Sequence, residues 1–386
     1  MTETLILATR GSELALRQAE TVRDALSTRR REVEIRRVET RGDQIPDELI
    51  HRLGRTGAFV RALDEEVLSG DADLAVHSMK DVPTEGGDSE ARRASGSRAS
   101  PDDLVVAGVP ERAASGDVLV HPESKALADL PSGAVVGTGS LRRTAQIKAR
   151  RPDLVVEPIR GNVDTRIEKL LAPGLQAEHE RRLIASGEDA ALTAEDDEET
   201  ADPDDPGEFD RSVEEWFDSL SDLERSAMER KVETEYDALV LAEAGLSRSN
   251  LLDEVGTTRL PREEFVPAAG QGAIAVTAAD DEVVEAVRSV VDHPRTRVAT
   301  TVERTVLAEL NGGCIAPIGV SALVQGEHVH VRARVLSTDG TEEVSGTRDL
   351  PIRSHATAAA SFAADLDDRG AAELIAEARE EVDADA

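Results

Sequence analysis

The fold class of this chain is decided near its N-terminus, by the stretch Leu5-Ile6-Leu7-Ala8-Thr9-Arg10-Gly11-Ser12. Its apolar run predicts a buried strand. Apolar residues then recur at helical spacing from Leu14 to Leu26, and Ser12 is suited to cap that helix. A strand that turns through glycine into a helix N-terminus forms a cradle for anions, and Arg10 adds positive charge to it.

The same alternation of strand and helix continues along most of the chain. It predicts an α/β fold with mainly parallel sheets. In such sheets ligands bind beyond the carboxyl ends of the strands, so we expect the functional site at that edge. The further strands of this pattern are predicted at 33–38, 72–78, 104–109, 118–120, 134–138, 154–159 and 236–242.

Arginines follow several of these strands. Two pairs lie at helix starts, Arg142 with Arg143 and Arg160 with Arg166, and Arg248 follows a later strand. Guanidinium groups bind carboxylates and phosphates through paired hydrogen bonds. Each arginine alone is also explained by a weak surface ion pair with one of the many acidic side chains. Their recurrence at strand ends in an acidic chain predicts a polyanionic ligand.

A carboxylate lies at the same predicted edge. The strand at 72–78 runs into Ser78-Met79-Lys80-Asp81, which places three polar side chains near Arg10 and Ser12. On its own, Asp81 is explained by a turn or a helix cap, where aspartate is favoured.

The overall charge restricts the partners of the protein. The formal charge is −33, from 78 acidic and 45 basic residues, of which only five are lysine. Such a surface repels nucleic acid and anionic lipid, so we expect partners of neither kind. An acidic surface with little lysine and few aromatic residues indicates adaptation to high salt, where ions screen self-repulsion. A disordered acidic protein is the alternative, but the apolar periodicity argues against it.

The sequence also restricts the cellular compartment and the chemistry of the cysteine. The N-terminus lacks the basic start and long apolar run of a signal peptide, and no segment approaches the roughly 18 apolar residues of a membrane span. A single cysteine excludes an intramolecular disulfide and a cysteine-based zinc site, and it fits a reducing compartment. We expect a soluble, cytoplasmic protein without a bound metal.

Residues 171–234 interrupt the alternation of strands and helices. From Glu195 to Asp210, 10 of 16 residues are acidic, and we expect this part to be disordered. At 213–223, apolar residues including Trp216 share one helical face. We expect that helix to pack back onto its own domain, with docking of a partner as the alternative.

The only cysteine lies in the stretch Asn311-Gly312-Gly313-Cys314-Ile315-Ala316-Pro317-Ile318-Gly319. The two glycines before Cys314 allow positive φ or close approach, and Pro317 and Gly319 are expected to fix a turn after it. The thiol is therefore presented on a shaped loop. By residue type alone a buried, inert cysteine is favoured, and a thiol bonded to a ligand is the alternative.

The last part of the chain predicts a small α+β domain. A helix at 296–310 precedes two antiparallel strands at 320–324 and 328–336, and a largely helical region spans 358–380. The glycine-rich turn at 267–276 is predicted to lead back to the first domain. We therefore predict domain 1 at 1–108 and 272–292, domain 2 at 109–271 with the acidic insertion, and domain 3 at 293–386.

Seven stretches follow one another in an order known from other proteins. They are residues 8–12, 76–83, 137–143, 160–166, 241–246, 267–273 and 312–319. Together they resemble the porphobilinogen deaminase family, also called hydroxymethylbilane synthase, over nearly the whole chain except 84–103 and 171–234.

This resemblance implies a fold and a reaction. Two domains would resemble the lobes of a periplasmic binding protein with a cleft between them. The third would carry a cysteine bonded through a thioether to a dipyrromethane cofactor. The reaction joins four porphobilinogen molecules head to tail, releases ammonia each time and frees hydroxymethylbilane by hydrolysis. A monomer with porphobilinogen as its small-molecule partner is expected.

The resemblance also assigns roles to individual residues. Asp81 matches the catalytic aspartate, whose carboxylate stabilises the positive charge that forms when porphobilinogen loses its amine. Cys314 matches the covalent anchor of the cofactor. Further cofactor-binding residues are expected to be Ser78, Lys80, Thr138, Ser140, Arg142 and Arg143. Substrate-binding residues are expected to be Arg10, Ser12, Phe59, Arg160, Arg166, Arg248 and Gln271.

Some of these assignments have alternatives. Phe59 is explained equally well by core packing, and Gln271 is expected to shape a hinge or line the cleft rather than to act in catalysis. The family often has a lysine where this chain has Thr56, so Arg55 or Arg52 is expected to supply the charge. From a different functional class, a two-lobed protein that binds a carboxylate without reacting remains the second hypothesis. Such a binder needs neither Asp81 nor Cys314.

Overall fold

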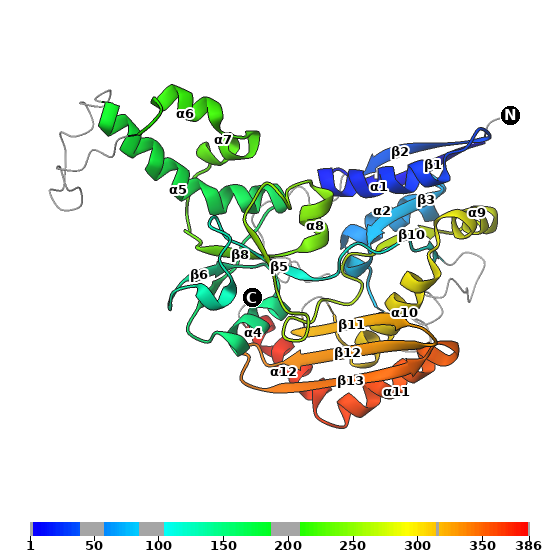
Figure 1. The fold of residues 1–386 in the computed structure, drawn as a ribbon. Coiled ribbons are helices and arrows are strands. Elements are labelled where there is room, and N and C mark those ends of the chain that lie inside the picture. Colours follow the sequence, from blue (N-terminus) through cyan, green and yellow to red (C-terminus); the bar gives the residue numbers. More distant parts are fainter. Residues whose placement is uncertain (1–2, 39–57, 85–103, 187–208, 314–315, 385–386) are drawn as a thin grey trace.

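The computed structural model of the chain describes residues 3–38, 58–84, 104–186, 209–313 and 316–384. Three sheets organise these residues, two with five strands and one with three. The two five-stranded sheets form two lobes, and the three-stranded sheet lies beside both of them (Figure 1).

The first lobe is built on the sheet β2-β1-β3-β10-β4. β1 pairs in parallel with β2 and β3, whereas β10 runs antiparallel to both of its neighbours. Helices α1 and α9 pack on one face and α2 on the other. The elements are β1 (Glu3–Arg10), α1 (Glu13–Leu26), β2 (Arg31–Val38), α2 (Ala58–Leu68), β3 (Leu74–Ser78), the 3₁₀ helix η1 (Met79–Asp81), β4 (Val105–Gly108), β10 (Ile274–Ala278) and α9 (Asp281–Val291).

The second lobe repeats this plan in the sheet β7-β6-β8-β5-β9. β6 is parallel to β7 and β8, and β5 is antiparallel to β8 and β9. α4 packs on one face, and α5 and α8 pack on the other. The elements are β5 (Asp117–Val120), η2 (Leu127–Asp129), β6 (Val135–Gly137), α4 (Leu141–Arg150), β7 (Val155–Glu157), α5 (Val163–Ser186), β8 (Ala238–Ala242), α8 (Glu243–Arg248) and β9 (Thr257–Arg259).

The predicted α/β class with mainly parallel sheets is confirmed, because in each lobe only one strand runs against the other four. The first sheet takes strands from both ends of the predicted first domain, since β10 joins it late in the chain. The exact domain boundaries stay predictions.

The third unit is an antiparallel sheet, β11-β12-β13, packed on helices of its own. β13 has no counterpart in the predicted strands, because Val344 and Leu350 are its only buried residues and give almost no alternating pattern. The elements are α10 (Pro294–Glu309), β11 (Ile318–Gln325), β12 (His328–Leu336), β13 (Glu343–Pro351), η3 (Ile352–Ser354), α11 (His355–Asp367) and α12 (Ala371–Ala384).

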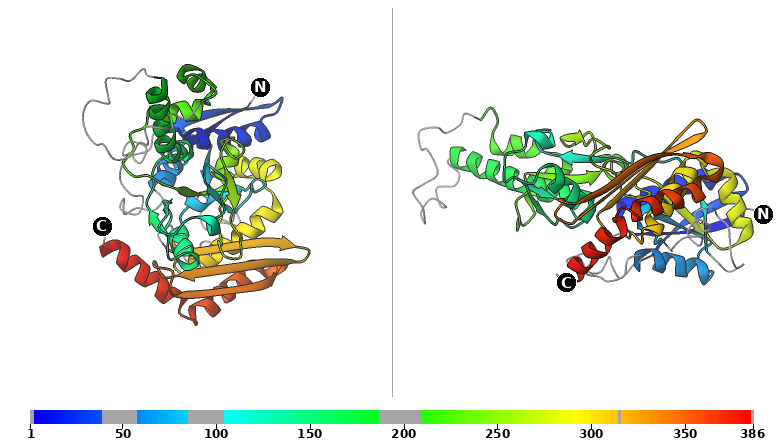
Figure 2. Two further views of the ribbon diagram at one scale, coloured as in Figure 1. Left: turned by 60° about the vertical axis from the view of Figure 1, so that its left-hand side comes forward. Right: turned by 90° about the horizontal axis from the view of Figure 1, so that it is seen from below.

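Helix α5 continues through Pro173 into the segment predicted as an insertion, and it projects away from the lobes with two short helices (Figures 1 and 2). The single helix predicted over 213–223 is wrong. Ser212 and Ser221 each begin a separate capping box, which divides the segment into α6 (Val213–Ser219) and α7 (Asp222–Met228). Most of the acidic run predicted to be disordered lies outside the described residues.

The predicted packing of this segment onto its own domain is confirmed, because Leu223 of α7 packs against the apolar cluster formed by β5, β8 and the start of α5. Trp216 of α6 is 6% exposed and stacks on His179 of α5 with ring centroids 5.8 Å apart. The Arg182 guanidinium lies 4.2 Å from the centre of the Phe209 ring and 5.1 Å from that of Trp216.

Candidate active site

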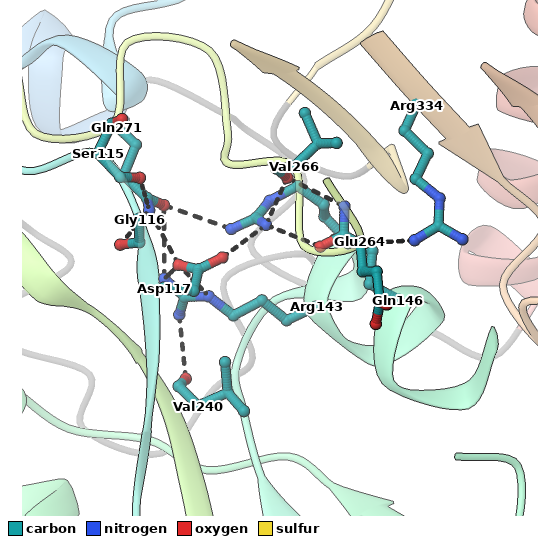
Figure 3. A network of polar contacts seen from close by, with 11 residues as sticks. Ser115, Gly116, Asp117, Arg143, Gln146, Val240, Glu264, Val266, Gln271 and Arg334 are labelled. Carbon is teal, nitrogen blue, oxygen red and sulfur yellow. Dashed lines mark hydrogen bonds and ion pairs between the residues drawn. The ribbon is translucent and has the colours of Figure 1, made fainter. Parts of the chain in front are cut away.

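A buried carboxylate organises the arginine-bearing end of the second lobe. Asp117 begins β5, and its side chain is fully buried. Its carboxylate accepts a hydrogen bond from Arg142 at 2.8 Å and two from Arg143, at 3.1 and 2.8 Å (Figure 3). Burial alone would raise the pKa of Asp117, but the two guanidinium groups hold it well below its usual range. Asp117 therefore stays ionised and fixes both arginines.

Gln271 completes this buried network from the segment that connects the lobes. Its amide nitrogen donates to the carbonyl oxygens of Ser115 and Gly116, at 2.6 and 3.1 Å, and to Asp117 at 2.9 Å (Figure 3). Its amide oxygen accepts from Arg142 at 3.3 Å and from Arg143 at 3.5 Å. At 1% exposure, Gln271 holds the arginines and the connecting strand together.

Two polar atoms at this end of the lobe are buried without a hydrogen-bond partner among the described residues. They are the hydroxyl of Thr138 and the Nε of Arg142. Ser140 stands at the N-cap of α4, yet its side chain makes no capping hydrogen bond. A buried polar group without a partner costs free energy unless a ligand supplies one.

The arginines at this end outnumber their carboxylate partners among the described residues. Arg142 and Arg143 share the single carboxylate of Asp117, and no carboxylate among the described residues forms an ion pair with Arg166. Burial, and then the charge of Arg143, lowers the pKa of Arg166 to about 10. Burial likewise lowers the pKa of Arg248, whose guanidinium donates to the Gly272 carbonyl at 2.7 Å. Carboxylates of a ligand would compensate these desolvated cations.

In the first lobe, the predicted site residues lie at strand ends. Arg10 ends β1, and the Ser12 hydroxyl caps α1 by accepting from the Ala15 amide at 3.3 Å. Ser78 ends β3 and leads directly into η1, which presents Lys80 and Asp81 as exposed side chains. Met79 lies between Ser78 and Lys80 in the sequence, and its buried side chain anchors that turn in the core.

The first turn of α1 in the first lobe lies near the first turn of α5 in the second lobe. The pKa of Asp164, in the first turn of α5, is raised by burial and next by the negative charge of Glu13, in the first turn of α1. The charge of Glu13 acts on Asp164 only because the two helix N-termini lie close together. Ser12 and Arg166, next to these acids, are thereby brought to the same region.

The cysteine loop borders the Asp81 turn. Cys314 itself lies outside the described residues, as do Thr56, Arg55, Arg52 and the side chain of Phe59. The Thr84 hydroxyl, three residues after Asp81, donates to the Gly312 carbonyl at 3.3 Å. The prediction that Gly319 fixes a turn is wrong. Gly319 lies in β11, where a Cβ atom would collide with the carbonyl oxygen of Val266.

Asp117 was not predicted as a site residue. One acid before an apolar strand looks like many others in a chain with 78 acidic residues. The available signal was indirect, since two adjacent arginines at a buried helix start need a carboxylate nearby.

Within the described parts, no helix is long and apolar enough to cross a membrane.

Comparison with known proteins covers almost the whole chain. A family model described as "Porphobilinogen deaminase, dipyromethane cofactor binding domain" matches residues 5–179 and 225–286, and one described as "Porphobilinogen deaminase, C-terminal domain" matches residues 298–362. The "Probable porphobilinogen deaminase" of Halobacterium salinarum is 54% identical over 402 residues, covering 97% of this chain and 98% of its own. The "Porphobilinogen deaminase" of Desulforudis audaxviator is 36% identical, covering 98% and 99%.

Among solved structures, a TRAP solute binding protein from a marine metagenome aligns over 99% of this chain and 98% of its own. The identity is 11% and the TM-score is 0.32. A likeness at that level supports no conclusion about this chain.

Proposed function

The chain belongs to the porphobilinogen deaminase family, and on that premise we propose that Asp81 is the catalytic carboxylate and Cys314 the anchor of the cofactor. The family reaction condenses four porphobilinogen molecules, with loss of ammonia at each addition, and releases hydroxymethylbilane. When bound, the dipyrromethane cofactor supplies the primer to which the new pyrrole units are joined. A two-lobed binder without catalysis is not favoured.

The described residues fit a group rich in carboxylates. Thr138 and Arg142 each hold a buried polar atom without a hydrogen-bond partner among the described residues, and the hydroxyl of Ser140 makes no capping bond. The arginines outnumber the one carboxylate between them. We assign cofactor binding to Ser78, Lys80, Thr138, Ser140, Arg142 and Arg143.

Substrate binding is assigned to the facing strand and helix ends. The acetate and propionate of porphobilinogen would be bound by guanidinium forks, and desolvation of Arg166 and Arg248 favours such pairing. Ser12 would add a hydrogen bond beside Arg10. The assigned residues are Arg10, Ser12, Phe59, Arg160, Arg166, Arg248 and Gln271, the last of which acts through the arginines that it holds.

One observation carries the catalytic assignment. Asp81 is an exposed carboxylate on a turn whose neighbour Met79 is buried, directly after β3 at the ligand-binding edge of the sheet. Loss of the amine leaves positive charge on the substrate's pyrrole. An aspartate held at this point stabilises that charge and exchanges protons with the substrate.

Asp81→Asn tests the assignment. We expect a folded protein that carries the cofactor but releases ammonia about 100-fold more slowly or worse, because the amide bears no charge. Asp71→Asn is the matched control, since Asp71 is an exposed aspartate near the opposite end of β3. It should keep full activity. Near-normal ammonia release by D81N would exclude Asp81 as the catalytic carboxylate.

The remaining assignments concern the setting of the enzyme. We propose that it works in the cytoplasm as a salt-adapted monomer. The acidic surface and the similarity to a protein of Halobacterium salinarum support the salt adaptation.

A further inference from the structure

One buried side chain of α10 reaches the turn that carries Asp81. Arg304 lies within α10 and is 2% exposed. Its Nη1 donates to the carbonyl oxygens of Met79 at 3.1 Å and Val82 at 2.8 Å, and its Nη2 donates to that of Pro83 at 2.9 Å. These three carbonyls stand on both sides of Asp81 in the sequence.

The arginine is chemically suited to this place. A short 3₁₀ helix leaves carbonyl groups without intrahelical partners, and buried carbonyls need donors. A planar guanidinium presents several N–H donors in a fixed fork, so it can bind three carbonyls at once in one geometry. The three bonds therefore set the direction in which the backbone leaves η1.

The other side of the turn is fixed by different contacts. The Met79 amide donates to the Ala273 carbonyl at 3.0 Å. Gly270, at φ +74, packs against the turn so closely that a Cβ atom would lie 2.7 Å from Cγ of Met79. These contacts hold the start of η1, whereas Arg304 also holds the residues after Asp81. Without Arg304, the end of the turn loses its fixed donor.

Arg304 also belongs to the helix that leads to the cysteine loop. α10 ends at Glu309, and the chain reaches Gly312, whose carbonyl accepts from Thr84 near the Asp81 turn. One helix thus holds the Asp81 turn and leads into the segment of the sequence that contains Cys314. We propose that Arg304 is a positioning residue that sets the Asp81 carboxylate relative to the group carried by Cys314. This inference rests on the function proposed above.

The same helix supplies a matched control. Arg297 lies seven residues before Arg304 and donates to the carbonyls of Val106 and Ala107 in β4, at 3.1 Å each. It also pairs with Asp292 at 2.8 Å. Arg297 therefore binds backbone carbonyls of the same lobe from the same helix, and its hydrogen bonds within the described residues go to β4 and Asp292 rather than to the turn at 79–83.

The experiment compares Arg304→Lys with Arg297→Lys in the cofactor-carrying enzyme. A lysine keeps the charge but cannot bind three carbonyls in the fixed guanidinium geometry. For R304K we expect full cofactor mass, a KM for porphobilinogen within about twofold of wild type, and a kcat per loaded molecule lower by about 10-fold or more. Amide hydrogen exchange in residues 79–84 should quicken in R304K and stay unchanged in R297K.

Several outcomes would overturn the proposal. The first is an unchanged kcat in R304K, and the second is an equal loss of kcat in R297K. The third is a lower kcat in R304K without any change in amide hydrogen exchange at residues 79–84. If R304K does not fold, R304Q takes its place. Failure of both to fold while R297K folds would make the role of Arg304 structural and contradict the proposal. An inactive D81N together with a fully active R304K would contradict only the positioning role of Arg304. An active D81N would contradict the assignment of Asp81 as the catalytic carboxylate.

Discussion

The arginines at the ligand-facing end of the second lobe differ in what neutralises them. Arg142 and Arg143 share Asp117, whereas Arg166 has no ion-pair partner among the described residues and its pKa is lowered to about 10. A desolvated cation without a carboxylate partner destabilises the fold but favours the binding of an anionic ligand. This is the balance between stability and function expected at a binding site.

Arg166→Met should therefore separate stability from binding. The folded pKa of about 10 lies below the ordinary 12.5, so the charged side chain opposes folding at neutral pH. That cost is constant below about 10 and declines as pH rises from there toward the unfolded pKa. In a cofactor-free C314S background, R166M should raise the melting temperature by about 2 °C or more.

In the cofactor-carrying enzyme, R166M should raise the KM for porphobilinogen about 10-fold. Arg150→Met is the control, because within the described residues Arg150 forms a single, exposed ion pair with Glu264. Its loss should change neither quantity. A lower melting temperature together with an unchanged KM in R166M would show that Arg166 is an ordinary structural arginine.

At the residue scale, sequence alone predicted the side chains at strand ends but not what they contact. Arg142 and Arg143 were expected to bind a ligand, and their shared bond to Asp117 was not visible. Asp117 lies 25 and 26 residues before them, and burial is a property of the fold. Arg304 was missed for the same reason, since its partners lie more than 200 residues away.

The elements were largely predictable because most are short, apolar and regular. β1, β3 and β8 carry continuous apolar runs that match their buried positions. β13 could not be predicted, since only two of its residues are buried. The end of α5 was not predicted either, because Pro173 in a helix interior normally ends a helix.

The end of α5 forms a projection together with α6 and α7, and this projection contains a natural fluorescent probe. Trp216 is the only tryptophan, and its contacts with His179 and Arg182 all lie within this projection. We expect tryptophan fluorescence to report unfolding at a lower denaturant concentration than far-UV circular dichroism, because the projection contributes little to the lobe cores. Coincident transitions would show that α6 and α7 unfold with the lobes as one unit.

At the scale of the whole molecule, the third unit, formed by α10 and the elements after it, contacts both lobes. Arg304 holds the Asp81 turn of the first lobe. Arg332 and Arg334 of β12 donate to the carbonyls of Glu263 and Glu264, next to the second lobe. Pairings over such sequence distances cannot be read from local patterns, although the three units themselves follow from the order of predicted elements.

The net charge of −33 should make stability depend on salt. Raising KCl from about 0.1 M to about 1 M shortens the Debye length from about 10 Å to about 3 Å and screens self-repulsion. We expect the melting temperature to rise by roughly 5 °C or more over this range. An uncharged osmolyte at equal osmolality should raise the melting temperature by less. A melting temperature that does not respond to KCl would contradict the proposed salt adaptation.

The central claim is that Cys314 carries the primer on which the chain of pyrroles grows, beside Asp81. Intact mass spectrometry of protein made in a host that produces porphobilinogen tests it most directly. We predict that the wild type carries the additional mass of two linked pyrrole units and that C314S has only the mass of its polypeptide. Wild-type protein without added mass, or the same added mass on C314S, would contradict the account.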